Sequence, residues 1–83
     1  MNVRITSIHE GERMILNIAG RLQSADLAEL NKEITSDVAS LMLDLSELLS
    51  ADRAGIELLR ELVAMGAELR GVSRYMQMLL NDQ

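Results

Sequence analysis

The chain has 83 residues, of which 48% are hydrophobic, with one Tyr and no Phe or Trp, so one small core must be built from aliphatic side chains and Met, with little room for an enclosed substrate cavity. A formal net charge of −5 argues against a nucleic-acid binder, whose affinity comes largely from cationic contacts to phosphate, and the eight Lys and Arg form no block. The lack of Cys excludes a disulfide framework and a thiolate metal site, and His9 is the single His, so neither a metal nor a cofactor is expected.

The first residues, MNVRITSIHEGER, contain no apolar stretch after the basic residue. No apolar run elsewhere in the chain approaches the roughly 20 residues that a membrane-spanning helix needs. We therefore expect a cytoplasmic protein with no direct membrane insertion.

The chain begins with the pattern of a β-hairpin. Val3 and Ile5 alternate with polar residues in NVRITSI, EGE forms a turn, and RMILNIAG is a second and more apolar run. This alternation predicts two antiparallel strands, with His9 exposed near the turn.

After Gly20 the apolar period becomes helical. Ser24 is predicted as the N-cap and Asp26 lies in the first turn, where the helix dipole favours negative charge. The apolar positions that follow are spaced by three and four residues: Leu27, Leu30, Ile34 and Val38.

The next segment, SLMLDLSEL, is a short and nearly continuous apolar run. Such a run predicts a central strand covered on both sides, with Asp44 hydrogen-bonded at the strand end, because an unpaired buried carboxylate would be costly. A second helix follows from about Asp52, with Arg53 and Glu57 as an ion pair and Gly66 as the C-cap.

AELRGVS then predicts a further strand and RYMQMLLN a short last helix, in which Met76 and Met78 are adaptable core filler or part of an apolar docking surface. The order of elements predicts a single α/β domain over residues 1–83. We expect about four strands in a mixed sheet, first an antiparallel hairpin and then parallel strands, with about three helices.

The junction between the central strand and the second helix reads SADRAG. Asp52 is expected to cap the helix by accepting from the backbone N–H of Ala54 or Gly55, and Gly55 allows another group to approach closely. Free N–H groups at a helix start, at the carboxyl end of a parallel strand, also suit a phosphate or a docking partner.

In their order along the chain these segments resemble the STAS domain, the fold of bacterial anti-sigma factor antagonists. NIAGRLQSADLAELNKEI is similar to that family's strand, Gly-x-Leu turn and first helix. LMLDLSELLSADRAGIELLRELVAMGAELRGVS resembles its central strand, Asp-Ser-Ser-Gly loop, second helix and return to the sheet. The resemblance covers nearly the whole chain and rests on the ordered set rather than on one diagnostic motif.

The resemblance implies a phosphorylation switch in this loop, and the sequence departs from it at the serine positions. In the family, a partner kinase that is itself an anti-sigma factor phosphorylates the second serine of the loop, and the phosphate blocks docking. Asp52 and Gly55 match the loop, whereas Arg53 and Ala54 replace the serines. Ala54 has no hydroxyl, so the resemblance implies a module that binds its partner constitutively, unless phosphorylation has moved to Ser50.

The expected partner-binding residues are Asp52, Arg53, Ala54 and Gly55, with Arg21 and Gln23 on the rim, where the family's turn is often acidic. The partner is a protein, either an anti-sigma factor and serine kinase or, in the alternative, a subunit of a bacterial lipid transporter for which this chain would be an accessory subunit. Since family members often extend further, an exposed sheet edge could also support a homodimer.

Two enzymatic or ligand-binding hypotheses have weaker support. Asp44 and Asp52 could act as an acid/base pair only if they converged on one cleft, and no second nucleophile or metal ligand accompanies them. Nucleotide binding rests only on the helix start at Ala54 and Gly55, because the chain has no Walker-type phosphate loop.

Overall fold

The computed structural model describes residues 3–35 and 37–81. In this part of the chain, five strands form one sheet, and three α-helices and two short 3-10 turns connect them. The strands are β1 (Val3–Glu10), β2 (Arg13–Leu22), β3 (Leu41–Asp44), β4 (Leu48–Ala51) and β5 (Glu68–Arg70). The helices are η1 (Ser24–Asp26), α1 (Leu27–Glu33), η2 (Val38–Ser40), α2 (Arg53–Ala64) and α3 (Arg74–Asn81).

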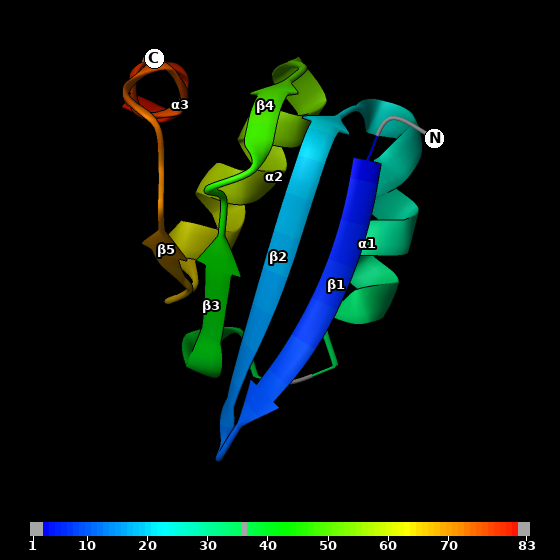
Figure 1. The fold of residues 1–83 in the computed structure, drawn as a ribbon, viewed down its shortest axis with the longest axis vertical. Helices are drawn as coiled ribbons and strands as arrows, with labels where there is room; N and C mark the ends of the chain where they lie inside the picture. Colours follow the sequence, from blue (N-terminus) through cyan, green and yellow to red (C-terminus); the bar gives the residue numbers. More distant parts are fainter. Residues whose placement is uncertain (1–2, 36, 82–83) are drawn as a thin grey trace.

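The sheet is mixed, as the sequence predicted. Its order is β1-β2-β3-β5, with β1 antiparallel to β2 and the later strands parallel to their neighbours. Helices α1 and α2 lie together on one face of the sheet, behind it in Figure 1, and α3 packs against α2. The predicted fold class, an antiparallel hairpin followed by parallel strands and three helices, is confirmed.

The strand predicted from SLMLDLSEL differs from the observed structure, because it is two strands rather than one. Both β3 and β4 run parallel to β2, and β3 pairs with Met14 to Asn17 whereas β4 pairs with Gly20 to Leu22. Between β3 and β4 the chain makes a turn that contains Glu47. The N–H of Gly20, in β2, donates to the carbonyl of Glu47 at 3.0 Å. The sheet therefore has five strands where about four were expected.

The prediction that this central segment is covered on both sides is wrong. Leu41 and Leu43 are fully buried on the face that carries the helices, whereas Met42 and Asp44 on the other face are only partly buried. The reason is that both α1 and α2 cover the same face of the sheet (Figure 1). The sequence did not show the alternation of buried and open positions along β3, because Met42 is apolar although it lies on the open face.

The core lies between the sheet and the two helices. Alternate residues of β2, Met14, Leu16 and Ile18, face the helices and have at most 1% exposure. Leu59 is fully buried on the facing side of α2. Each fully buried aliphatic side chain contributes about 1.5–3 kcal/mol relative to an exposed one, so this layer holds α2 and its N-terminus in place.

The ends of the helices agree with the sequence only in part. The predicted N-cap Ser24 is wrong: Gln23 precedes the first turn, its N–H donates to the carboxylate of Asp26 at 3.0 Å, and Asp26 is in turn the N-cap of α1. The C-cap of α2 is Met65, and the predicted Gly66 is the residue after it, with φ of +112°, a backbone region that favours glycine. His9 is exposed near the hairpin turn, as predicted.

Candidate functional site

The site that the sequence singled out lies at one end of the sheet, where β2 and β4 finish and α1 and α2 begin (Figure 1). Strand pairing places Arg21 opposite Ser50, and Leu22 opposite Ala51. Helix α2 begins one residue after Asp52, at Arg53. The structure thus brings the predicted rim residue Arg21 to the strand that leads into SADRAG.

Asp52 holds two turns together. Its carboxylate accepts from the N–H of Gly55 at 2.8 Å through one oxygen and from the N–H of Ser24 at 2.9 Å through the other. Its own N–H donates to the carbonyl of Leu22 at 3.0 Å. The predicted cap of α2 is therefore present, and it is made to Gly55. The second contact, to the turn between β2 and α1, could not be seen in the sequence.

These contacts weaken the nucleotide hypothesis. A phosphate at a helix start is bound by free backbone N–H groups. Here the N–H of Gly55 is already satisfied by the negatively charged Asp52, which would also repel an anion. The arrangement is that of a structural cap and not of a phosphate cradle.

Gly55 is required by the packing of the backbone. A Cβ atom at this position would lie 2.9 Å from the carbonyl oxygen of Leu22 and 3.3 Å from both the Cβ of Ala51 and the carboxylate of Asp52. The glycine therefore lets α2 start directly against the end of β2.

Arg53 and Ala54 present different surfaces. The Arg53 side chain is 93% exposed and its Nε lies 3.7 Å from the carboxylate of Glu57, so the ion pair predicted from sequence is present but solvated. Ala54 is partly buried and lines an open depression between α1 and α2 with a volume of about 470 Å³. Gln23 is exposed and precedes Ser24, whose N–H donates to Asp52, whereas the predicted docking residue Gly55 is buried.

Asp44 lies elsewhere and has partners of its own. One oxygen accepts from the N–H of Ser46 at 3.0 Å and from its hydroxyl at 2.8 Å, and the other accepts from Arg70 at 3.0 Å. The hydrogen bonds from Ser46, together with Arg70, hold the pKa of the Asp44 carboxyl below its usual value. Asp44 and Asp52 share no partner, so the geometry gives no support to an acid/base pair. Asp44 instead ties the end of β3 to β5.

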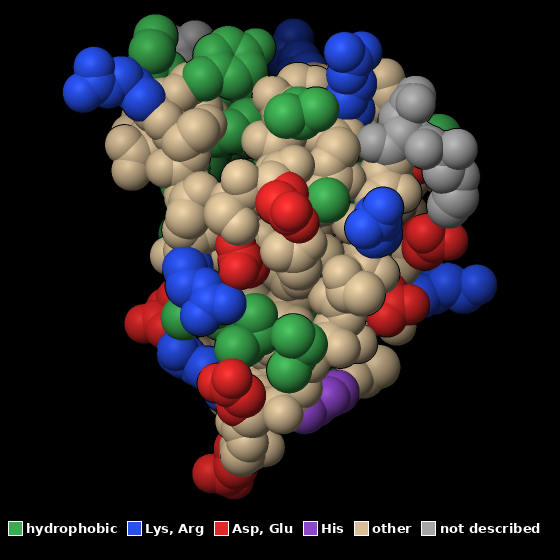
Figure 2. Space-filling view, viewed as in Figure 1, with side chains coloured by type: hydrophobic (Ala, Val, Ile, Leu, Met, Phe, Trp, Pro, Cys, Tyr) green, Lys and Arg blue, Asp and Glu red, His purple; other side chains and the backbone are tan. Residues whose placement is uncertain are grey.

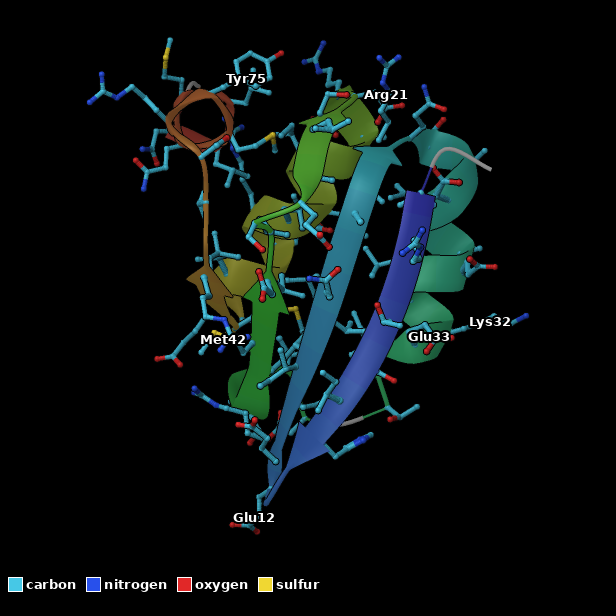
Figure 3. The ribbon with its side chains drawn as sticks, viewed as in Figure 1. Glu12, Arg21, Lys32, Glu33, Met42 and Tyr75 are labelled. Carbon is cyan, nitrogen blue, oxygen red and sulfur yellow. The ribbon has the colours of Figure 1, made fainter. Side chains whose placement is uncertain are left out.

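A group of exposed apolar residues lies at the same end of the molecule and was largely missed from the sequence. Leu49 is 67% exposed, Tyr75 56% and Met78 65%. Figure 2 shows hydrophobic side chains over α3 and β4, with Lys or Arg side chains on either side, and Figure 3 places Tyr75 and Arg21 at this end. Met76, considered with Met78 as a docking residue, is fully buried. The spacing of Tyr75 and Met78 by three residues was the available signal.

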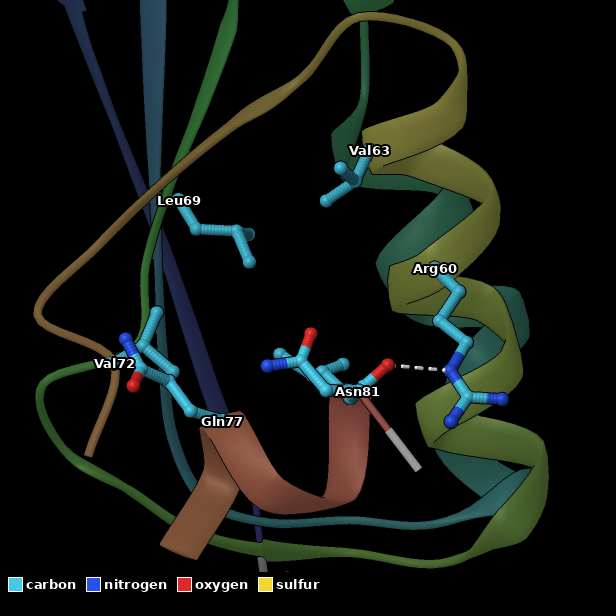
Figure 4. Close-up of a pocket in the computed structure, with 7 residues that line it drawn as sticks. Arg60, Val63, Leu69, Val72, Gln77 and Asn81 are labelled. Carbon is cyan, nitrogen blue, oxygen red and sulfur yellow. Dashed lines mark hydrogen bonds between the residues drawn. The ribbon is translucent and has the colours of Figure 1, made fainter. Parts of the chain in front are cut away.

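A separate groove lies between α2, β5 and α3 and has a volume of about 400 Å³ (Figure 4). Val63, Leu69 and Val72 form much of its wall. Arg60 reaches across it and donates to the carbonyls of Leu80 at 2.7 Å and Leu79 at 2.9 Å, at the C-terminal end of α3. The guanidinium is engaged in holding the helix, so the groove offers no free charged group from Arg60 to a ligand.

Within residues 3–35 and 37–81, no group of three or more His, Asp or Glu side chains is placed to hold a metal ion. No described helix is long and apolar enough to cross a membrane.

Comparisons with known proteins agree with this geometry at the level of the fold. No family model and no curated protein sequence matches the chain. Among solved structures, the chain is similar to an anti-sigma-factor antagonist STAS domain from Rhodobacter sphaeroides, with a TM-score of 0.62 and 20% sequence identity over 87% of this chain and 92% of that chain. It is also similar to part of a structure described as Mglu, with a TM-score of 0.55 and 20% identity over 83% of this chain and 19% of that chain. The STAS-like fold predicted from the sequence is therefore confirmed.

Proposed function

We propose that the protein is a non-catalytic STAS-type module that binds a protein partner through the surface around the start of α2. This junction surface consists of Arg21, Gln23 and the Asp52 to Gly55 turn. The observation that carries the proposal is the double role of Asp52, whose carboxylate fixes both turns of the surface at 2.8 and 2.9 Å. A surface that is ordered before binding loses less conformational entropy on association, which favours docking.

We propose further that binding is constitutive. Ala54 stands where the family carries its phosphoacceptor and has no hydroxyl. Ser50, the alternative acceptor, is partly buried within β4 and paired with β2, which disfavours access by a kinase. The hydroxyl of Ser46 already donates to Asp44. These placements support an interaction that is not switched at this loop.

The partner that fits the fold is an anti-sigma factor of the serine-kinase type, acting in transcriptional regulation in the bacterial cytoplasm. In the alternative, the same surface would dock on a subunit of a lipid transporter. Both partners are proteins, and identification of the bound protein by mass spectrometry separates them.

The test is charge reversal at the most exposed residue of the junction surface. Arg53→Glu removes one weak ion pair with Glu57, worth at most about 0.5 kcal/mol to the helix, so folding should be nearly unchanged. At a docking contact the same change should abolish co-purification of the natural partner, because like charges would face each other. Circular dichroism and urea unfolding verify that the variant is folded.

Lys32→Glu is the matched control, since it makes the same charge change on an exposed residue of α1 that Figure 3 shows away from the junction surface. It should leave co-purification intact. If Arg53→Glu captures the same partner with unchanged affinity, docking occurs elsewhere and the proposed map of the surface is wrong.

A further inference from the structure

We propose that the apolar group formed by Leu49, Tyr75 and Met78, called here the α3 patch, binds an apolar segment of the partner protein that is flanked by carboxylates. This inference rests on the proposed function and deepens it, because it extends docking beyond the junction surface to α3 and assigns the chemistry of the partner.

The α3 patch is unusually exposed for its composition. Its three residues are between 56% and 67% exposed, and Tyr75 is the only aromatic residue of the chain. Tyr75 and Met78 are three positions apart on α3 and therefore lie on one face, and both line a shallow depression of about 430 Å³. Contiguous exposed apolar side chains with a polar border are typical of interaction surfaces, and Tyr is enriched among the residues that carry binding energy.

The patch is held in a fixed position. Met76 is fully buried on the opposite face of α3, and its N–H donates to the hydroxyl of Ser73 at 3.1 Å, which caps the helix start. At the other end, Arg60 donates to the carbonyls of Leu79 and Leu80. Anchored at both ends, α3 presents Tyr75 and Met78 without a large ordering cost on binding.

The charged side chains around the α3 patch indicate the charge of the partner segment that would bind there. Arg74 lies four positions before Met78 on α3. Figure 3 places Arg21 at the same end of the molecule as Tyr75, and Arg53 begins α2 directly after Asp52. Figure 2 shows Lys or Arg side chains on both sides of the apolar side chains at this end. Neither Arg21 nor Arg74 forms an ion pair with another described residue, and Arg53 has only the solvated contact with Glu57. This cationic border contrasts with the net charge of −5 of the whole chain. Carboxylates on the partner would complement it.

Among the described residues, the acidic residues nearest in the chain form no ion pair with Arg21 or Arg74. Glu57 lies one turn into α2, and Glu47 is in the turn before β4, where its carbonyl accepts from Gly20. The carboxylate of Asp52 is directed to two backbone N–H groups and forms no ion pair with these arginines. The cationic side chains thus remain available at the edge of the patch.

Two other occupants fit less well. A second copy of the chain docking by the same patch would bring two cationic borders together, because a two-fold interface uses the same surface on both copies. An anionic membrane fits less well because three arginines are fewer than the about four to eight cations of a polybasic membrane site. Charge therefore favours an acidic protein segment.

Tyr75 provides a direct readout, since the chain has one Tyr and no Trp. The full chain would be titrated with two helical peptides that lack Tyr and Trp and carry the same Leu and Met stripe. One peptide has Glu on both sides of the stripe and the other has Lys. We expect the Glu peptide to change the emission intensity and anisotropy of Tyr75, with weaker binding at higher salt, and the Lys peptide to have no effect.

Variants locate the binding. Met78→Ser and Arg74→Glu should each weaken the Glu peptide by roughly tenfold or more, a hot-spot effect. Ile8→Ser, at a residue that is 56% exposed on β1, is the matched control and should leave binding unchanged. Equal binding of both peptides, no response to the Glu peptide up to millimolar concentration, or no effect of either patch variant would overturn the inference.

Titration with vesicles of phosphatidylserine and phosphatidylcholine tests whether the α3 patch binds a membrane instead. A response of Tyr75 to these vesicles, without a response to the Glu peptide, would also overturn the inference. This outcome can be distinguished from failure of the proposed function. Suppose that Arg53→Glu loses the natural partner, that Met78→Ser retains it and that the Glu peptide does not bind. The partner then docks on the junction surface and the inference about the α3 patch is wrong.

Discussion

Replacement of Gly55 by Ala tests whether the start of α2 is set by backbone packing. Two effects compete. Within a helix, Gly→Ala is favourable by about 0.5–1 kcal/mol, because Ala loses less conformational entropy on folding. Against this, the new Cβ would lie 2.9 Å from the carbonyl oxygen of Leu22, a backbone atom of a buried strand end that cannot move as a flexible side chain can.

Overpacking of this kind typically costs about 1–3 kcal/mol. The contacts at 3.3 Å with Ala51 and with the capping carboxylate of Asp52 add to the strain and weaken the cap. We therefore expect Gly55→Ala to be destabilising by about 1–2 kcal/mol net, which lowers the melting temperature by about 4–16 °C in a domain of this size.

The assay is urea unfolding followed by far-UV circular dichroism. Ala54→Gly is the control, since it measures the opposite propensity change at the adjacent position of the same turn and should destabilise by no more than about 1 kcal/mol. A Gly55→Ala variant as stable as the wild type, or more stable, would refute the argument that the Leu22 carbonyl requires a glycine.

Three further predictions follow from the core, the charge and the switch. Leu59→Ala should lower the free energy of unfolding by about 2–5 kcal/mol through a cavity, whereas Leu49→Ala at an exposed site should stay within about 0.5 kcal/mol; a small loss at Leu59 in urea unfolding would show that α2 is not packed as described. Because its hydrogen bonds lower the pKa of Asp44, its stabilisation is present above the ordinary pKa of about 3.9 and is lost as the pH falls through the folded-state value. The stability gap between wild type and Asp44→Asn should therefore be largest at neutral pH and shrink below about pH 4, and a gap independent of pH would contradict the role of this carboxylate. Incubation with the proposed partner, a serine kinase, should leave the wild-type loop unmodified and phosphorylate Ala54→Ser, as read by mass spectrometry; phosphate on Ser50 of the native protein would mean that the switch has moved.

The sequence by itself determined the elements whose signal is local. Alternation around Val3 and Ile5 predicted the hairpin, and the three-and-four spacing after Asp52 predicted α2, because burial of one face repeats with the period of the backbone. The cap from Asp52 to Gly55 was also predictable, since its partners are three residues apart. The exposed ion pair of Arg53 and Glu57 has the same local origin.

Only the tertiary structure decided the contacts that join distant segments. Asp52 binds the N–H of Ser24, 28 residues away, and Arg60 holds the end of α3 about 20 residues away. The break between β3 and β4 was hidden for the same reason, because the partner that defines it is β2 and the run LMLDLSEL is apolar on both sides of the turn. The α3 patch likewise combines Leu49 of β4 with Tyr75 and Met78 of α3, two elements that the path of the chain brings to the same end of the molecule (Figure 1). Local periodicity sets which residues share a face, but the free energy that brings two faces together depends on the whole packed core.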